Sequence, residues 1–187
     1  MAPGRGLFGI ATGRDRSMTV HGIEKWGISF DFLVCHNGAV VYDEKFTILT
    51  SRRLPVSVAK SLLSHPAAAA SIHWQLCIDG SVMLYLNSER SWFPQLGVPY
   101  VEIDDKQAPS AIHIHQISFR YDTDTECKKW GDELAGSFPD SIILQKNTTF
   151  MGITGANISK ATGIRNLTVP TAQQTVKKAC FFSISRT

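Results

Sequence analysis

The sequence predicts an α/β fold in which a larger α+β unit interrupts the first sheet. Two observations lead to this prediction. Residues 1–42 read as strand, helix, strand, turn, strand, which is the rhythm of a βαβ unit with a parallel sheet. From Asp43 onward, hairpin signals and alternating apolar residues predict a separate antiparallel sheet with its own helices.

The opening strand covers residues 7–11 and stops at Thr12, Gly13 and Arg14. This ending places a hydroxyl, backbone N–H groups and a guanidinium at the carboxyl edge of a sheet, where ligands bind in open α/β folds. Hydroxyl and N–H groups donate hydrogen bonds, and arginine offers a planar pair of donors. The stretch therefore suits a phosphate, although a purely structural turn accounts for it equally well.

A helix is predicted next, with Asp15 or Ser17 as its N-cap and Gly27 as its end. Trp26 is expected on its apolar side, since apolar residues recur there at every third position. Two β-type runs follow, at 30–35 and 39–42. The Asn-Gly pair between them is a strong signal for a tight turn.

Residues 43–154 are predicted to form the α+β unit. The expected elements are a strand at 46–50, a helix at 55–65 terminated by Pro66, a hairpin of 72–78 and 82–86 around Asp79-Gly80, a short strand at 100–103, a strand within 111–121, a helix at 123–137, and strands at 141–145 and 149–153. The apolar alternation within 111–121 slips once, near Gln116.

Composition excludes several classes of protein. A chain of 187 residues that is 43% hydrophobic and 19% charged can bury a core, and its net charge of +3 is spread along the chain, so no nucleic-acid partner is expected. No apolar run reaches membrane-spanning length and no secretory leader is recognisable, which predicts a cytoplasmic protein without a membrane partner. The four cysteines, which form no CxxC pair, are expected to be thiols rather than zinc ligands or a disulfide framework: Cys35, Cys77, Cys127 and Cys180.

Near the carboxyl end, a short helix is predicted over residues 161–167, with Ser159 as a possible cap and Lys160 in its first turn. The helix dipole favours acids at this end rather than a lysine. Lys160 is therefore either an ordinary surface residue or a cation presented to an anion at the helix N-terminus.

Three runs occur in a telling order: Ile10 to Arg14, Asn37-Gly38-Ala39, and Asn157 to Ile164 after the α+β unit. Together they resemble the haloacid dehalogenase (HAD) superfamily, specifically its Cof-type sugar-phosphate phosphatases with a large α/β cap. The resemblance implies a Rossmann-like core with an inserted cap domain, and Mg²⁺-dependent hydrolysis of phosphoesters through an aspartyl-phosphate. It divides the chain into partial core (1–42), cap (43–154) and a C-terminal part of the core (155–187).

The resemblance also implies roles for individual residues. Thr12 corresponds to the hydroxyl that binds the transferring phosphoryl group, and Lys160 to the lysine that offsets negative charge there. Asn37 corresponds to an asparagine in the loop beside the site. The expected phosphate-binding residues are Thr12, Gly13 and Lys160, and the expected substrate-side loop residues are Arg14, Asn37 and Gly38.

The chain departs from the family pattern in its acids. No acidic residue precedes Thr12, and none follows Lys160. The family's nucleophile, its general acid/base and its metal carboxylates are therefore absent, so no catalytic or metal-binding residue is assigned. We expect a core truncated at both ends and an inactive chain.

Two functions remain open. By ancestry, the protein is a phosphatase of small phosphorylated metabolites such as sugar phosphates. As the chain stands, it is a non-catalytic remnant or a phosphate-binding or interaction module. The sequence decides neither this question of enzymatic activity nor the oligomeric state.

Other acidic and histidine patterns have simpler explanations. The Asp-x-Asp pattern at 122–125 lies after Thr12 rather than before it, and is expected to cap a helix. The Gly-Asp pair at 131–132 is expected at the surface. His113 and His115 share a predicted strand face and could bind a metal, but an exposed or cap-interface position is the better interpretation because no third ligand is indicated.

Overall fold

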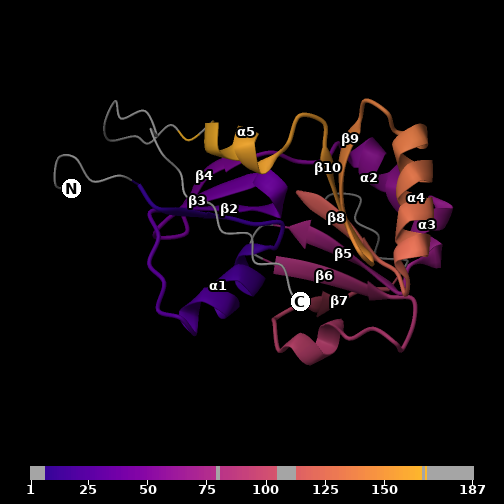
Figure 1. Cartoon of the computed structure of the whole chain (residues 1–187), viewed down its shortest axis with the longest axis horizontal. Helices are drawn as coiled ribbons and strands as arrows, with labels where there is room; N and C mark the ends of the chain where they lie inside the picture. Colours follow the sequence, from indigo (N-terminus) through magenta and orange to yellow (C-terminus); the bar gives the residue numbers. More distant parts are fainter. Residues whose placement is uncertain (1–6, 79–80, 105–112, 166, 168–187) are drawn as a thin grey trace.

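The computed structural model describes residues 7–78, 81–104, 113–165 and 167. These residues form two sheets accompanied by helices, with the N-terminal sheet on the left of Figure 1 and the larger sheet on the right. The mixed architecture confirms the predicted α/β class. Among the described residues, no helix is long and apolar enough to cross a membrane.

The first sheet has four strands in chain order: β1 (Gly9–Ala11), β2 (Phe32–Cys35), β3 (Val40–Asp43) and β4 (Ile48–Ser51). β1 and β2 are parallel and are joined through helix α1 (Arg16–Glu24), as the βαβ rhythm predicts. β3 and β4 are antiparallel to their neighbours, because the 3₁₀ turn η1 (His36–Gly38) is too short for a parallel crossover. The predicted boundary after residue 42 therefore falls within the β3–β4 hairpin.

Two helices cover opposite faces of this sheet. Leu33 and Cys35 point to the side of α1 and pack with Ile23. Val34 points to the other side, where Ile164 of α5 (Lys160–Arg165) packs. The alternation along β2 explains this division, since successive side chains of a strand point to opposite faces.

Asp15 caps α1 as predicted, through hydrogen bonds that its carboxylate accepts from the backbone N–H groups of Ser17 and Met18. The expectation for Trp26 is wrong. The helix ends at Glu24, and the Trp26 side chain lies beyond it with 78% of its surface exposed. A spacing of three residues drifts around a helix of 3.6 residues per turn, so it does not keep a residue on one face.

The second sheet has six strands in the order β7-β6-β5-β8-β10-β9. All neighbouring pairs are antiparallel except β6 and β7, which are parallel. The hairpin of β5 and β6 is confirmed, whereas its Asp79-Gly80 turn lies outside the described residues. The strands are β5 (His73–Ile78), β6 (Ser81–Leu86), β7 (Val101–Glu102), β8 (Gln116–Arg120), β9 (Ile142–Asn147) and β10 (Phe150–Gly155).

Three helices cover the outer face of this sheet, away from the first one (Figure 1): α2 (Val56–Leu63), α3 (Pro66–Ala70) and α4 (Asp124–Ser137). They enclose the largest hydrophobic cluster, in which Trp74, Leu76 and Phe119 of the sheet pack with helix residues such as Leu62 and Leu134. Pro66 does more than end a helix. α2 ends at Leu63, and Pro66 begins α3. A proline is tolerated in the first turn of a helix because backbone N–H groups there have no acceptor within the helix.

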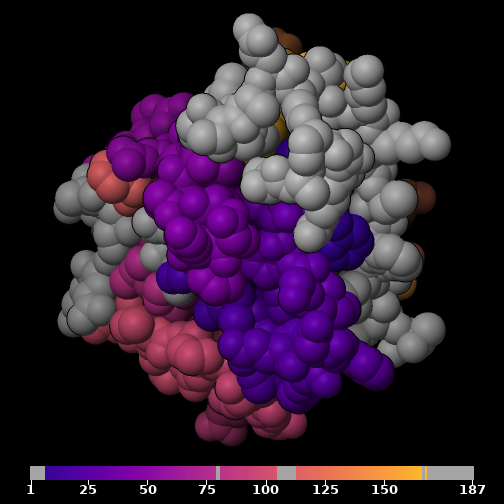
Figure 2. All heavy atoms as spheres, turned by 90° about the vertical axis from the view of Figure 1, so that its left-hand side faces the viewer, coloured from indigo at the N-terminus to yellow at the C-terminus, as the bar shows by residue number. Residues whose placement is uncertain are grey.

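The opposite, inner face of the six-stranded sheet meets the N-terminal segment. Met18 of α1 packs against Val82, Leu84 and Phe93, the last of which lies in the 3₁₀ turn η2 (Phe93–Leu96). In Figure 2 the indigo N-terminal residues accordingly lie directly beside the pink residues that follow β6. The inner face is otherwise polar near the first sheet, with buried Gln75, Gln116 and Ser118.

Three of the cysteines are free thiols as expected, and all three are buried: Cys35, Cys77 and Cys127. Burial raises the pKa of each of them. Cys180 lies outside the described residues.

Candidate functional site

Two loops lie together at the carboxyl ends of the parallel strands β1 and β2. We call residues 12–14 and 36–38 the paired loops. The N–H of Thr12 donates to the carbonyl of Val34 (2.8 Å), and the N–H of Asn37 donates to the carbonyl of Thr12 (3.0 Å). The N–H of His36 donates to the carbonyl of Arg14 (3.0 Å). These bonds continue the β1–β2 pairing into the loops, at the sheet edge where ligands bind in α/β folds.

The Thr12 hydroxyl accepts a hydrogen bond from the N–H of Arg14 (3.1 Å), which closes a small turn. A hydroxyl that accepts in this way still has its own proton to donate. Thr12, Gly13 and Arg14 are all partly exposed. The turn can therefore offer a hydroxyl donor to an anion from a position already held by the backbone.

Helix α5 approaches the paired loops closely because two glycines allow it. A Cβ atom on Gly38, whose φ is +107°, would lie 2.0 Å from the carbonyl oxygen of Ser159. A Cβ on Gly163 would lie 3.0 Å from the Cα of Gly38. This close crossing brings the first residue of α5, Lys160, to the paired loops.

The start of α5 is capped as predicted. The Ser159 hydroxyl oxygen accepts from the N–H of Thr162 (3.1 Å), and the Thr162 hydroxyl oxygen accepts from the N–H of Ser159 (2.8 Å). Reciprocal bonds of this kind fix the first turn of a helix. Lys160 is half-buried, and its ammonium group has no ion-pair partner in the part of the chain that the structure describes.

The structure thus brings together all six residues singled out from the sequence. Thr12, Gly13 and Arg14 form one of the paired loops, Asn37 and Gly38 the other, and the backbone of Lys160 lies beside Gly38. What each side chain binds is a matter for proposal.

Sequence reasoning missed a seventh residue, Gln116, which reaches the paired loops from the second sheet. The Asn37 Nδ2 group donates to Gln116 Oε1 (2.8 Å). In turn, Gln116 Nε2 donates to the carbonyl of Gly13 (3.1 Å) and to the hydroxyl of Ser118 (2.9 Å). The slip in apolar alternation near Gln116 marks the start of β8, but it does not indicate which loop this side chain meets.

Gly152 of β10 leaves room for this contact. A Cβ there would lie 3.1 Å from Asn37 Nδ2 and 3.2 Å from Gln116 Cδ. A larger residue at this position would press on the Asn37–Gln116 pair, so the glycine of β10 allows the hydrogen bond between the second sheet and the paired loops.

A buried histidine lies in the same contact zone. His36 is fully buried, and its ring stacks on that of His115 with centroids 5.8 Å apart. Burial, with a smaller effect from His115, lowers the pKa of His36 to about 3. Among the described residues, neither ring nitrogen of His36 has a hydrogen-bond partner. His113 is exposed while His115 is buried, so the two do not form a metal pair.

Asp15 is the acid nearest to Thr12 in sequence, and its carboxylate is used for capping. Its Oδ1 accepts from the N–H (2.6 Å) and hydroxyl (2.6 Å) of Ser17 and from the N–H of Met18 (3.1 Å). Burial raises the pKa of Asp15 above its usual range. A carboxylate that is 1% exposed and already accepts three hydrogen bonds is a poor nucleophile for a group bound at Thr12.

The donors at the paired loops fit a phosphate better than the Mg²⁺ that the family resemblance implies. Magnesium prefers carboxylate oxygens and water, whereas the loops offer a hydroxyl, an amide, backbone N–H groups and a lysine. Across the described residues, no group of three or more His, Cys, Asp or Glu side chains could hold a metal ion. Asp122 pairs with Arg90, and the capping box of Thr123 and Glu126 opens α4, so the 122–125 pattern is structural as expected.

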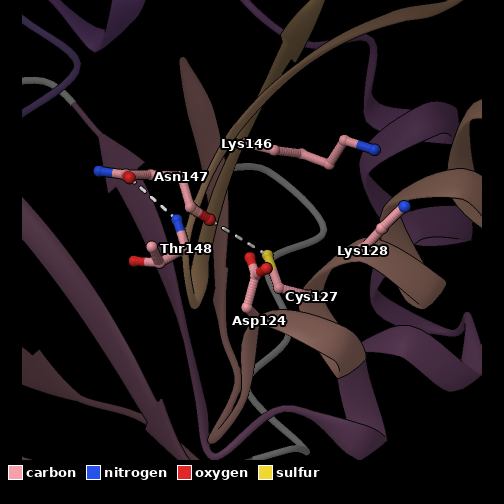
Figure 3. Close-up of a pocket in the computed structure, with 6 residues that line it drawn as sticks. All are labelled: Asp124, Cys127, Lys128, Lys146, Asn147 and Thr148. Atoms are coloured by element: carbon pink, nitrogen blue, oxygen red, sulfur yellow. Dashed lines mark hydrogen bonds between the residues drawn. The ribbon is translucent and has the colours of Figure 1, made fainter.

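A shallow cavity of about 390 Å³ lies elsewhere, between the start of α4 and the β9–β10 turn (Figure 3). Its thiol, Cys127, donates to the carbonyl of Asn147 (3.5 Å). Lys146 donates to Asp132 (2.7 Å), so one of its two cations is already paired. The cavity lies at the α4 side of the six-stranded sheet, opposite the face that meets the paired loops. It is lined by Asp124, Cys127, Lys128, Lys146, Asn147 and Thr148.

Solved structures from several organisms share this fold. A Thermotoga maritima protein superposes with a TM-score of 0.67 at 21% identity, covering 84% of this chain and 60% of its own. A Plasmodium vivax protein described as a putative HAD/COF-like hydrolase gives 0.72 at 17% identity, covering 85% and 59%. A sugar phosphatase of HAD subclass IIB gives 0.65 at 16% identity, covering 85% and 60%.

The chain therefore spans about three fifths of the length of these structures. No curated protein matches it. The family model of haloacid dehalogenase-like hydrolases matches residues 6–176, which is most of the sequence. The chain belongs to the haloacid dehalogenase-like hydrolase family.

Proposed function

We propose that this chain binds the phosphoryl group of a small phosphorylated metabolite at the paired loops. The observation that supports the proposal is the convergence of Thr12, Asn37 and Lys160 at the carboxyl edge of a parallel strand pair. In this assignment the Thr12 hydroxyl donates to a phosphate oxygen. The Lys160 ammonium offsets the charge of the phosphate, and Arg14 and Gly13 complete the loop.

The second sheet is proposed to act as a cap that selects the remainder of the ligand. Its polar inner face meets the paired loops through Gln116, which supports this role. One structural neighbour is described as a sugar phosphatase, and another belongs to a phosphoryl-transfer superfamily. A sugar phosphate of the Cof type is accordingly the proposed ligand class, with residues 43–154 as the proposed cap domain.

Hydrolysis is proposed to need more than these 187 residues. Phosphatases of this family use an aspartate nucleophile and Mg²⁺, and the donors at the paired loops suit neither role. The chain by itself is proposed to be a phosphate-binding module. The alternative, that it hydrolyses phosphoesters as it stands, rests on its family membership.

Calorimetric titration with inorganic phosphate tests the binding. We expect wild-type protein to bind phosphate, and Thr12→Val and Lys160→Gln each to weaken the affinity about tenfold, since each removes a hydrogen bond or a charge. Thr125→Val is the matched control, because Thr125 is an exposed residue of α4. Equal affinity in all four proteins would refute the assignment.

An aryl phosphate assay with Mg²⁺ tests the alternative. The binding-module proposal expects no turnover above background. Turnover that disappears in Thr12→Val would instead establish the chain as an enzyme, and would show that a nucleophile had been overlooked.

A further inference from the structure

Gln116 connects the two sheets at the point where phosphate binding is proposed. Its amide makes three hydrogen bonds, two as donor and one as acceptor, to Asn37, Gly13 and Ser118. Asn37 belongs to η1 and Gly13 to the turn after β1, so one amide from β8 joins both of the paired loops. The residue is 1% exposed, so its bonds to Asn37 and Ser118 are shielded from water and its bond to Gly13 is partly shielded.

The geometry of Asn37 makes this connection consequential. Asn37 has a φ of +56° and follows His36, whose φ is +49°. Two consecutive residues in the left-handed region are strained unless their surroundings hold them. The Asn37 backbone is held by Thr12, and its side chain is held by Gln116.

Other buried polar atoms in the contact zone have no hydrogen-bond partner in the part of the chain that the structure describes. They are both ring nitrogens of His36 and the hydroxyl of Thr154, none of which bonds to another described residue. The strand register places Thr154 next to Gln116 on the inner face, since Ile153 pairs with Ile117 and the strands are antiparallel. A partly satisfied polar network depends strongly on the bonds that it does make.

We propose that Gln116 is a positioning residue that holds Gly13 and Asn37 in their phosphate-binding arrangement, so that anion affinity at the paired loops depends on contact with the second sheet. The inference rests on the proposed phosphate site, and it adds which residue outside the site sets its affinity. Gln116 does not touch the phosphate. It acts through the carbonyl of Gly13, which orients the peptide next to Thr12, and through the amide of Asn37. By linkage, bound phosphate also strengthens the contact between the sheets.

Gln116→Leu removes all three bonds while keeping similar bulk. We expect phosphate affinity to fall about tenfold, because the Gly13 carbonyl and the Asn37 amide lose buried partners. Gln116→Glu tests the positioning role through the pH dependence of phosphate affinity, which would not change if Gln116 were only structural. Ionised, the new carboxylate can accept from Asn37 but cannot donate to Gly13, whereas its protonated form can do both. Burial raises the pKa of such a group.

Affinity of Gln116→Glu relative to wild type at the same pH should therefore be weak at about pH 8 and recover towards about pH 5. Comparison with wild type at each pH cancels the ionisation of phosphate itself. Gly152→Ala, which presses on the same pair, should weaken binding several-fold. Gly136→Ala is its control, because a Cβ at Gly136 meets nothing within 4 Å.

Backbone amide exchange supplies the second readout. Saturating phosphate should slow exchange in β8 and η1 of the wild type, but not in Gln116→Leu. This measurement also separates a folding defect from a positioning effect, since an unfolded variant would exchange rapidly along the whole chain.

The outcomes distinguish the two proposals. If wild type binds no phosphate, or if Thr12→Val leaves binding unchanged, the phosphate site itself is wrong. If Thr12→Val weakens binding while Gln116→Leu, Gln116→Glu and Gly152→Ala all bind like wild type, the site stands and the role of Gln116 is refuted. A pH-independent loss in Gln116→Glu would also refute it.

Discussion

The two sheets of this protein are stabilised in different ways. The six-stranded sheet buries a large hydrophobic cluster under α2, α3 and α4, with residues such as Leu76 and Phe119 at its centre. The four-stranded sheet has strands of three or four residues and buries two smaller clusters, around Leu33 and Val34. Its paired loops also depend on the close backbone approach of α5 at Gly38 and Gly163. The difference teaches that the region proposed to bind phosphate adds a close backbone crossing to a small hydrophobic core, whereas the region beside it is stabilised mainly by one large core.

Truncation in the large cluster should have the greatest effect on stability. Phe119→Ala removes a fully buried ring and should lower the free energy of unfolding by about 3–5 kcal/mol. Urea denaturation followed by circular dichroism measures this loss. Phe30→Ala, at a half-buried ring beside the smaller sheet, should cost clearly less. Equal losses would mean that the two cores contribute alike.

Substitution at a backbone crossing should come next. Gly38→Ala forces a Cβ onto the Ser159 carbonyl and strains a positive φ, and should cost about 3 kcal/mol. Gly97→Ala also has a positive φ, +68°, but nothing lies within 4 Å of its Cβ. It should cost about 1–2 kcal/mol from backbone strain alone. Thermal unfolding measures the loss of stability in both variants. The difference between the two losses is the share caused by the contact between Gly38 and Ser159.

Acid should destabilise the contact between the sheets through His36. The pKa of His36 is lowered from 6.5 to about 3 in the folded protein, so between these values the unfolded chain binds the proton and the folded chain does not. Stability is therefore complete above about pH 6.5 and falls with pH. The expected loss is about 2–3 kcal/mol by about pH 4.5.

Urea denaturation of wild type and His36→Asn, above about pH 6.5 and again at about pH 4.5, measures the contribution of His36 to the free energy of unfolding. Asparagine tolerates the left-handed backbone conformation of residue 36. Since it does not titrate in this range, His36→Asn should lose clearly less stability in acid than wild type. His21→Asn, at an exposed position on α1, is the matched control and should respond like wild type. The same acid response in all three proteins would rule out His36 as the cause.

The smallest effect concerns a helix cap of the six-stranded region. Thr123→Ala removes the hydroxyl that accepts from the N–H of Glu126 (3.2 Å), and should cost about 1 kcal/mol. Thr125→Ala, two residues later on the exposed side of α4, should be nearly neutral. A loss in Thr123→Ala as large as that in Gly38→Ala would remove the distinction between the two regions.

Local patterns predicted most of the fold. The alternation in β5 and β6, the Asn-Gly turn before β3, and the caps Asp15 and Ser159 all appear in the structure, because each depends on residues close in sequence. The position predicted for Trp26 is wrong, because a spacing of three residues does not keep a side chain on one helix face. The helix before Pro66 ends as predicted, and Pro66 also begins α3.

The candidate site was only partly predictable. Thr12, Asn37 and Lys160 came from motif order, which records ancestry rather than contact. Gln116 could not be identified as their neighbour, because nothing local to β8 indicates which loop of another sheet its amide will meet. The direction of β3 is a similar case. The βαβ rhythm predicts a parallel sheet, but the three-residue turn η1 is too short for a parallel crossover, so β3 pairs antiparallel with β2.

The exposure of Trp26 has a practical consequence. Trp74 is stacked on Tyr85, and Trp92 lies under the guanidinium of Arg120, whereas Trp26 faces solvent near the end of α1. A collisional quencher such as iodide therefore reaches Trp26 first. Trp92 and Trp130 are half-buried and Trp74 is buried, so the fluorescence lost at low quencher concentration reports mainly on the N-terminal region.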